Sequence, residues 1–369
     1  MTFKHFPQDL LNSPIEDKVE YFEQDVSVSH PNLTDAYTNL EKLVKANSNK
    51  GSLILLMGPP GVGKTHLISK FYEDYIHKNE EAMSEDPGLI PIIKVNAPSP
   101  ETGKFDWKAL YRRLLKAGEE PLINSKVKQE YDPETKKLIQ RKRGSVSNYK
   151  ESLINVIKYR KVKLIIIDET QHLGKVKSAE QHANQLDVLK DIVNESEVTI
   201  VMVGNYNLRS FTSASAQLSR RIKEIVIYRY RENPTDYQKF ANTLNSFLKR
   251  MPIENGLEFS EEVVMFFYER CGGLIGILKD LLDSGYSSYL QRGSKKDIAL
   301  KDFEEFVMKP EALKMLLSEI RQDEHQLLND NKSKYSNLYS FEHQDKGSKK
   351  KGNKKPGQRN PVRDNVDGV

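Results

Sequence analysis

The chain has 369 residues, enough for roughly two or three domains that each bury a core. Its formal net charge is +5, but a run of lysines and arginines without any acid at 346–363 accounts for this excess. The rest of the chain is slightly acidic, which excludes a uniformly basic, histone-like coat. The single cysteine, Cys271, excludes an intramolecular disulfide and cysteine-rich metal sites, and its apolar surroundings predict an inert core thiol.

We expect a cytoplasmic protein that has no membrane partner. No apolar run approaches the roughly 20 residues that a membrane helix needs. The first residues mix acids with proline and lack the apolar segment of a signal peptide. A lone cysteine also fits a reducing compartment.

The sequence predicts an α/β domain over 30–232. Residues 1–29 before it are polar and lack sustained periodicity, so we expect an arm or a poorly ordered lead-in there. Strand-like runs then alternate with segments of helical period, and LIIID and TIVMVG are typical of strands buried on both faces. This pattern indicates a parallel five-stranded sheet between two layers of helices. The five runs are 53–57, 90–95, 163–167, 198–203 and 224–228.

The strand signals stop after Pro234, and the chain that follows is helical in pattern. Several segments within 233–309 open at Ser, Thr or Asp caps, which predicts a small helical domain. Residues 310–369 are expected to form one more polar helix and then a basic, disordered tail. We also predict an insertion at 119–143, because its DPETKK segment is typical of a β-hairpin tip or a loop.

Residues 58–65 read GPPGVGKT, a full match to the phosphate-binding pattern G-x-x-x-x-G-K-[ST]. Gly61 and Gly63 allow the backbone to fold around an anion, Lys64 reaches the β- and γ-phosphates, and Thr65 ligates Mg²⁺. A buried strand precedes the loop and an amphipathic helix follows it, so the context fits. ATP and Mg²⁺ are therefore the expected cofactors. The residues expected to bind the nucleotide are Gly58, Pro59, Pro60, Gly61, Val62, Gly63, Lys64, Thr65 and His66.

A second acidic motif, LIIIDE at 164–169, ends a hydrophobic strand in two carboxylates. Asp168 is expected beside the loop, where it can hold Mg²⁺ through water, and Glu169 can polarise the attacking water. Two carboxylates at a strand end can also be a solvated terminus. Asn205 follows the next buried strand, where it can touch the γ-phosphate or the water, or simply form a turn. His172 and His182 have no third ligand, so we interpret His172 as positioning the neighbours of Glu169.

With these motifs the chain resembles AAA+ ATPases over about residues 27–308. Within that superfamily, DETQHL at 168–173 and the segments VMVGN and AQLSRRIKEIVIY look like the TnsC/TniB regulators of DNA transposition. The lead-in VSVSHPNLTDAYTNLEKL is similar to that group as well. The resemblance implies an AAA+ three-layer P-loop NTPase domain followed by a helical lid. It also implies ATP hydrolysis to ADP and phosphate.

The resemblance further implies a homo-oligomer, either a filament or a ring. Arg221 would then be an arginine finger that acts in trans on the neighbouring subunit's γ-phosphate, with Arg220 as the adjacent candidate. The alternative is a cation pair that satisfies the end of a helix. Ile277 stands where many AAA+ lids carry an arginine, so either Lys279 takes over that role or lid sensing is absent.

Two segments gather basic residues and are candidates for DNA contact. One is the predicted helix at 104–116, which also holds the only tryptophan, and the other is 126–143, where basic residues outnumber acidic ones. A charged run is often just a solvated face, but clustered cations also bind phosphates. The resemblance implies that residues of these segments line the inner surface of the assembly. The expected contacts to double-stranded DNA, without sequence readout, are Lys108, Arg112, Lys142, Arg143 and Ser145.

In the role that the resemblance implies, the ATP-bound assembly marks a target site and recruits a transposase, together with a target-selector protein. Hydrolysis at Glu169 then disassembles it. Two alternatives stay open: a helicase-loader or replication-initiator type of AAA+ ATPase, and a protein-sensing signalling or defence NTPase that does not bind DNA. The basic tail at 346–363 can contact DNA, bind the transposase or only solubilise the chain.

Overall fold

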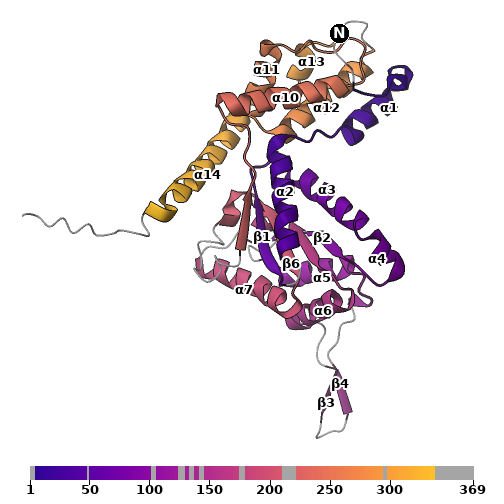
Figure 1. The fold of residues 1–369 in the computed structure, drawn as a ribbon, viewed down its shortest axis with the longest axis vertical. Helices are drawn as coiled ribbons and strands as arrows, with labels where there is room; N and C mark the ends of the chain where they lie inside the picture. Colours follow the sequence, from indigo (N-terminus) through magenta and orange to yellow (C-terminus); the bar gives the residue numbers. More distant parts are fainter. Residues whose placement is uncertain are drawn as a thin grey trace, which may run out of the picture. The chain divides into compact units, whose positions relative to one another are not determined.

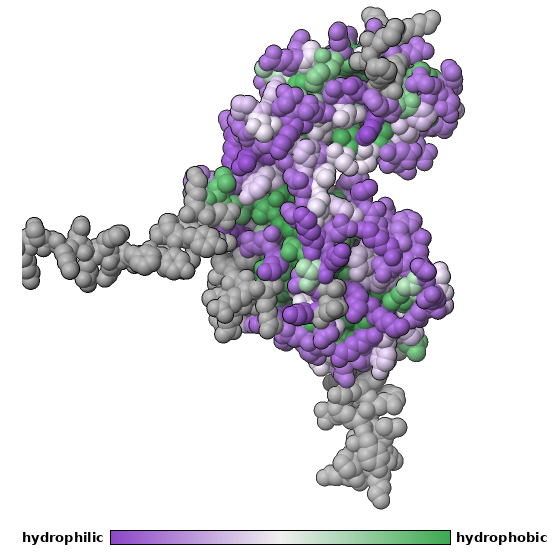
Figure 2. All heavy atoms as spheres, viewed as in Figure 1, coloured by the Kyte–Doolittle hydropathy of each residue, from purple (hydrophilic) through white to green (hydrophobic). Residues whose placement is uncertain are grey.

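The structure is a computed structural model, and contacts divide the chain into a compact unit, Met1–Asp323, and a second unit, Glu324–Val369. No helix among the residues that the structure describes is long and apolar enough to cross a membrane. Hydrophilic residues cover most of the face drawn in Figure 2, with apolar side chains in smaller patches. The described residues are 5–47, 50–100, 105–123, 129–132, 137–140, 145–173, 179–209, 222–293 and 297–336.

The α/β domain contains a five-stranded parallel sheet in the order β2-β5-β6-β1-β7. Figure 1 labels β1, β2 and β6 at the centre of this domain. The strands β1, β5 and β6 are buried along their whole length, as their runs of Ile, Leu and Val predicted. Each neighbouring pair is parallel, so the carboxyl ends of all five strands meet at one edge. The strands are β1 (Ser52–Met57), β2 (Ile92–Asn96), β5 (Leu164–Asp168), β6 (Thr199–Gly204) and β7 (Ile222–Val226).

The helices beside this sheet form two groups. In one group α2 packs on α3 and on β7, and in the other α6 packs on both α5 and α7. α2 shows why such a helix forms, because Leu33, Ala36, Leu40 and Val44 recur at three- and four-residue spacing and are all buried. The elements are α2 (Pro31–Ala46), α3 (Lys64–His77), α4 (Glu80–Glu85), α5 (Trp107–Ala117), α6 (Val146–Tyr159), η4 (Thr170–His172), α7 (Ala179–Ser196) and η5 (Tyr206–Leu208).

The predicted insertion contains a β-hairpin. Its strands, β3 (Gln129–Asp132) and β4 (Lys137–Gln140), pair antiparallel with Asp132 opposite Lys137. The tip between them, 133–136, lies outside the described residues. The sequence DPETKK therefore connects two paired strands, as its turn-forming residues predicted.

Of the two possibilities for residues 1–29, an arm or a poorly ordered lead-in, the second does not hold for the described residues 5–29, because they are folded. Three short elements form there: η1 (Gln8–Asn12), α1 (Ile15–Glu20) and η2 (Tyr21–Asp25). Phe22 is fully buried in the core of the helical domain, where its ring lies 5.1 Å from that of Tyr286. This stretch has few apolar residues and buries only some of them, which leaves no helical period for the sequence to show.

The helical domain follows β7 and has its own core, which includes Phe22. Asn233 and Ser260 cap two of its helices, since their side chains accept hydrogen bonds from the backbone N–H groups of Asp236 and Val263. Cys271 is fully buried there, which confirms the predicted core position, and burial raises the pKa of its thiol to about 12. The helices are α10 (Pro234–Arg250), α11 (Glu261–Cys271), α12 (Ile275–Gln291), α13 (Lys301–Glu304) and α14 (Pro310–Ser336).

Candidate functional site

The phosphate loop connects β1 to α3 at the carboxyl edge of the sheet. Gly61 and Gly63 have φ angles of +72° and +97°, in the left-handed region that side chains disfavour. A Cβ atom at Gly63 would lie 3.0 Å from the Leu33 side chain, so α2 closes one side of the loop. Gly58 N–H donates a 3.2 Å hydrogen bond to the carbonyl oxygen of Gly204, which ties the loop to β6. Gly61 and Gly63 therefore take the backbone conformations that the motif predicted, and the binding of an anion there stays a prediction.

Lys64 is the charged residue of this loop. Its ammonium donates hydrogen bonds to the carbonyl oxygens of Gly58 and Pro59, each at 2.9 Å. Burial lowers the pKa of Lys64 to about 8, and the negative charges of Asp168 and Glu169 oppose that shift. The cation is thus held close to both carboxylates of the second motif.

Asp168 and Thr65 come together beside the loop. The Thr65 hydroxyl donates to Asp168 Oδ2 at 3.3 Å, and the Glu169 N–H donates to Asp168 Oδ1 at 2.8 Å. Asp168 is only 4% exposed, and burial raises the pKa of its carboxyl above the usual range. A hydroxyl and a carboxylate are hard oxygen ligands, which fit Mg²⁺ when phosphate oxygens and waters complete its shell.

Glu169 follows β5 and is exposed, with a left-handed φ of 57°. Its carboxylate accepts a short hydrogen bond from the side-chain amide of Gln171, which sequence reasoning missed. Thr170 fixes this turn to the sheet through a 2.8 Å hydrogen bond from its hydroxyl to the Val203 carbonyl. The only available signal for Gln171 was its place two residues after the acid, inside η4.

His172 lies in the same turn, and its backbone N–H donates to the carbonyl oxygen of Glu169 at 3.1 Å. Its Nε2 is 3.4 Å from the hydroxyl oxygen of Ser99. These contacts agree with an orienting role. Among the described residues there is no group of three His, Cys, Asp or Glu side chains that could hold a metal. The side chain of His182 is not described.

Asn205 follows β6 at the same edge. Its side-chain oxygen accepts a 3.2 Å hydrogen bond from the backbone N–H of Asn207, so it caps η5. The turn-forming interpretation therefore has a contact to support it, and a catalytic role stays a prediction. The structure brings five of the expected site residues to one sheet edge: Lys64, Thr65, Asp168, Glu169 and Asn205.

The first turn of α12 lies directly against the phosphate loop. Gly276 N–H donates to the Gly61 carbonyl oxygen at 2.6 Å, and a Cβ at Gly61 would lie 3.0 Å from the Ile277 side chain. Lys279 is engaged elsewhere, because its ammonium donates to the Phe22 carbonyl at 2.6 Å and pairs with Asp283. Lys279 therefore secures the N-terminal segment, and the side chain of this turn that packs on Gly61 is the apolar Ile277.

A pocket of about 120 Å³ lies next to the start of α3. His66, the last of the expected nucleotide-binding residues, lines it, and its Nε2 is 3.0 Å from the hydroxyl oxygen of Ser27. The segment 27–30 thus lies beside the first turn of the loop helix. The complete lining is Val28, Ser29, Leu33, Thr34, Tyr37, His66, Leu67 and Lys70.

The candidate DNA residues that the structure describes gather around α5 and the start of α6. Lys108 Nζ lies 5.4 Å from the ring centre of Tyr149, in the first turn of α6, and Ser145 caps that helix by accepting from the Asn148 N–H. Arg112 is exposed on α5. Its neighbour Arg113 instead donates to the Asn96 carbonyl at 2.8 Å, which is a structural contact. Lys142, Arg143, Arg220 and Arg221 lie outside the described residues.

Comparisons with known proteins agree with this architecture. Residues 47–211 match the sequence model of a family described as AAA domain. The structure is similar to Cdc6p from Pyrobaculum aerophilum, with a TM-score of 0.51 and 15% identity over 80% of this chain and 73% of that one. The domain match and this likeness together show the AAA+ P-loop NTPase fold.

Two further structures lie at lower similarity. ORC2 from Aeropyrum pernix, in ADPNP–ADP complexes, gives a TM-score of 0.49 at 12% identity over 78% of this chain and 70% of that one. Domain III of the replication initiation protein DnaA from Thermotoga maritima gives 0.44 at 17% identity over 79% and 98%. None of the curated proteins matches the sequence.

Proposed function

From the AAA+ P-loop NTPase fold and the geometry of its loop, we propose that this protein is an ATPase that binds Mg²⁺ and ATP. The observation that carries the proposal is the meeting of Lys64, Thr65, Asp168 and Glu169 at one edge of the sheet, with Thr65 and Asp168 in direct contact. We further propose that it acts as a TnsC/TniB-like regulator of DNA transposition. That finer part rests on the resemblance of the DETQHL, VMVGN and SRRIKEIVIY segments.

Each group at this edge has a distinct task in the proposed reaction. The N–H groups of the loop and the Lys64 ammonium hold phosphate oxygens, and Thr65 and Asp168 hold the metal ion. Mg²⁺, when bound, neutralises charge on the phosphate oxygens. Glu169 accepts a proton from the attacking water, and Gln171 orients the Glu169 carboxylate for this task. Asn205 is the further candidate for contact with the γ-phosphate or that water.

The pocket beside α3 is suited to the base or ribose of the nucleotide. It lies next to His66, which immediately follows Thr65 of the loop, and Val28, Leu33 and Leu67 give it apolar walls. Flat apolar surface with a few polar groups is what a nucleobase needs. His66 and the segment 27–30 would then contact the nucleoside, while the loop contacts its phosphates.

We propose that subunits associate head to tail, so that Arg221 of one subunit completes the nucleotide site of the next. Such heterologous contacts give a ring where they close and a filament where they do not. The assembly would contact double-stranded DNA through Lys108, Arg112 and Ser145, and through Lys142 and Arg143 on the insertion. Phosphate contacts of this kind bind without reading sequence. The ATP-bound assembly would recruit a transposase and a target selector.

Glu169→Gln tests the reaction and the assembly together. We expect the variant to bind ATP, to lose turnover, and to form longer-lived assemblies on duplex DNA. The measurements are an ATPase assay with and without DNA, and negative-stain microscopy with a non-hydrolysable ATP analogue. Glu81→Gln, at an exposed position of α4, is the matched control. A Glu169→Gln protein that hydrolyses ATP at the normal rate would remove Glu169 from the mechanism.

The same measurements separate the alternatives. A replication-initiator or helicase-loader type of AAA+ ATPase also works on DNA. The likeness in fold to Cdc6p is compatible with this alternative. It would recruit a helicase, so stimulation of turnover by a transposase and not by a helicase excludes it. A protein-sensing NTPase would bind ATP and stay dispersed and indifferent to DNA.

A further inference from the structure

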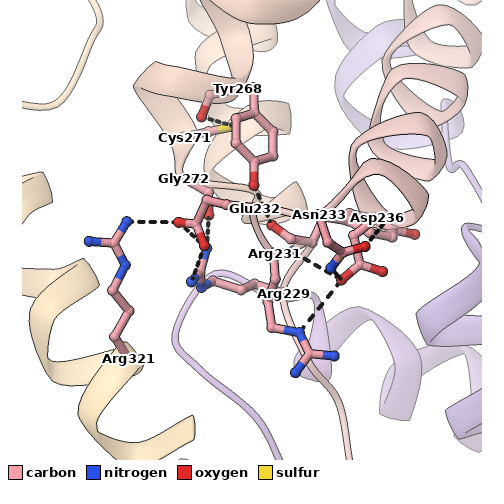
Figure 3. Close-up of polar contacts among 10 residues, drawn as sticks. Arg229, Arg231, Glu232, Asn233, Asp236, Tyr268, Cys271, Gly272 and Arg321 are labelled. Carbon is pink, nitrogen blue, oxygen red and sulfur yellow. Dashed lines mark hydrogen bonds and ion pairs between the residues drawn. The ribbon is translucent and has the colours of Figure 1, made fainter. Parts of the chain in front are cut away.

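The segment that joins β7 to α10 carries a buried charge. Arg229 is only 1% exposed, and its two terminal nitrogens each donate a 3.2 Å hydrogen bond to one carboxylate oxygen of Glu232 (Figure 3). A third hydrogen bond, also 3.2 Å, runs from Arg229 to the carbonyl oxygen of Gly272. The planar guanidinium therefore bonds to Glu232 and to the Gly272 carbonyl at the same time. A lysine ammonium lacks the paired donors that match both oxygens of a carboxylate.

The carbonyl that Arg229 holds belongs to the turn that leads into α12. Tyr230 N–H donates to the carbonyl of the next residue, Gly273, at 3.0 Å, and any Cβ at Gly273 would overlap the Tyr230 backbone. Shortly after this turn, Gly276 N–H reaches the Gly61 carbonyl of the phosphate loop. A continuous series of contacts thus runs from Arg229 through the glycine turn to the nucleotide site.

The C-terminal helix α14 meets the same junction. Leu317 packs so closely on the glycine turn that a Cβ at Gly272 would lie 2.5 Å from it. One helical turn further on, Arg321 donates a 2.7 Å hydrogen bond to Glu232 Oε1 (Figure 3). Burial alone would raise the pKa of Glu232, but the hydrogen bonds from Arg229 and Arg321 outweigh it and lower the pKa to about 2. Glu232 is therefore ionised and shared between two arginines.

We propose that Arg229 and Glu232 are positioning residues for the nucleotide site, which hold the first turn of α12 against the phosphate loop, and that Arg321 makes this placement depend on α14. The proposal rests on the proposed nucleotide-binding function. Glu232 is the common point of the arrangement. A change in α14 alters how firmly Glu232 is held, Glu232 orients Arg229, and Arg229 fixes the glycine turn before α12.

Arg321→Ala tests the proposal without endangering the fold. The Arg321 and Glu232 side chains are 58% and 50% exposed, so their pair adds little stability and the melting temperature should hardly change. The measurement is the release of a fluorescent ADP analogue from the full-length protein in a stopped-flow instrument. We expect release about two- to fivefold faster, the size that loss of one exposed ion pair allows.

Two further variants make the result specific. Arg321→Lys keeps a charge near Glu232 and should restore most of the slow release, whereas Lys314→Ala, at an exposed position of the same helix, should change nothing. A structural role alone would move the melting temperature and leave release untouched. Arg229→Lys keeps the buried charge but loses the paired hydrogen bonds to Glu232, and it should also speed the release of the ADP analogue.

The outcomes separate this inference from the function on which it rests. A wild-type protein that does not bind the ADP analogue removes the nucleotide-binding function itself. A wild-type protein that binds it, with Arg321→Ala and Arg229→Lys both releasing it at the wild-type rate, overturns the inference alone. Faster release in both, with Lys314→Ala unchanged, supports it.

Discussion

Gly276→Ala tests whether the contact between α12 and the phosphate loop matters for nucleotide binding. Gly276 lies in the first turn of α12 and has no positive φ, so its backbone accepts an alanine without strain. The new Cβ would lie 2.6 Å from the Gly61 carbonyl oxygen and 3.0 Å from its carbon, both of them backbone atoms. Neither can rotate away, so the first turn of α12 has to withdraw from the loop.

The size of the effect follows from these distances. Moving the Cβ out to an ordinary contact of 3.4 Å shifts the turn by about 0.8 Å and stretches the 2.6 Å hydrogen bond to Gly61 beyond a normal length. That loses about 1 kcal/mol, while alanine in place of glycine favours the helix by about 1 kcal/mol. The free energy of unfolding should therefore change little. Nucleotide affinity should fall about fivefold, because the displaced turn no longer holds Gly61 in the conformation that receives phosphate, a loss about the size of one hydrogen bond.

The assay combines thermal unfolding with a nucleotide titration on the full-length protein. Gly256→Ala is the control, because its Cβ would meet only the Ile253 side chain at an ordinary 3.4 Å. The expected signature is a nearly unchanged melting temperature without nucleotide and a smaller stabilisation when nucleotide is added. Wild-type affinity in the Gly276→Ala protein would refute the idea that this contact shapes the site.

Two further predictions concern a buried histidine and the DNA surface. Burial, aided by the charge of His66, lowers the pKa of His30 to about 4 from 6.5, so the unfolded state takes up the proton first as the pH falls. Stability should drop by up to about 3 kcal/mol from pH 6.5 to pH 4, and His30→Gln should flatten that part of the profile in urea unfolding. Lys108→Ala should weaken binding to all duplex sequences alike and reduce the salt dependence by about one unit, measured by fluorescence anisotropy. A loss confined to one sequence would contradict the phosphate-contact interpretation.

The sheet and the phosphate loop could be predicted from sequence because each produces a pattern in a short stretch of residues. Continuous runs of apolar residues fix the buried strands, and parallel pairing then forces their carboxyl ends together. Asp168 and Thr65 are far apart along the chain, yet each directly borders a strand or loop whose place is determined. Their meeting is a consequence of topology and needs no long-range sequence signal.

Contacts between distant segments without a local pattern could not be predicted. Phe22 is buried against Tyr286, and its carbonyl oxygen accepts a hydrogen bond from the Lys279 ammonium. No sequence pattern near residue 22 predicts this core position. Gln171 has no motif that assigns it to Glu169. Such partners are set by how whole domains pack together. Composition and periodicity carry no information about that packing.

The lid contact has a consequence for how the site distinguishes nucleotides. An arginine in the lid would act on the phosphates through its charge, but here Ile277 packs on Gly61 and the polar contact is between backbone atoms. The contact from the Gly276 N–H to the Gly61 carbonyl oxygen carries no side-chain charge that could sense a γ-phosphate. The placement of α12 is instead set from the other side, by the buried Arg229 and its partner Glu232. Under the proposed function, groups outside the lid would then sense the γ-phosphate: Asn205 of the same subunit, and Arg221 of a neighbouring subunit, whose charge is permanent. We therefore expect the proposed assembly to contribute to the preference for ATP over ADP, while Arg229, Glu232 and α14 would set how long any nucleotide stays bound.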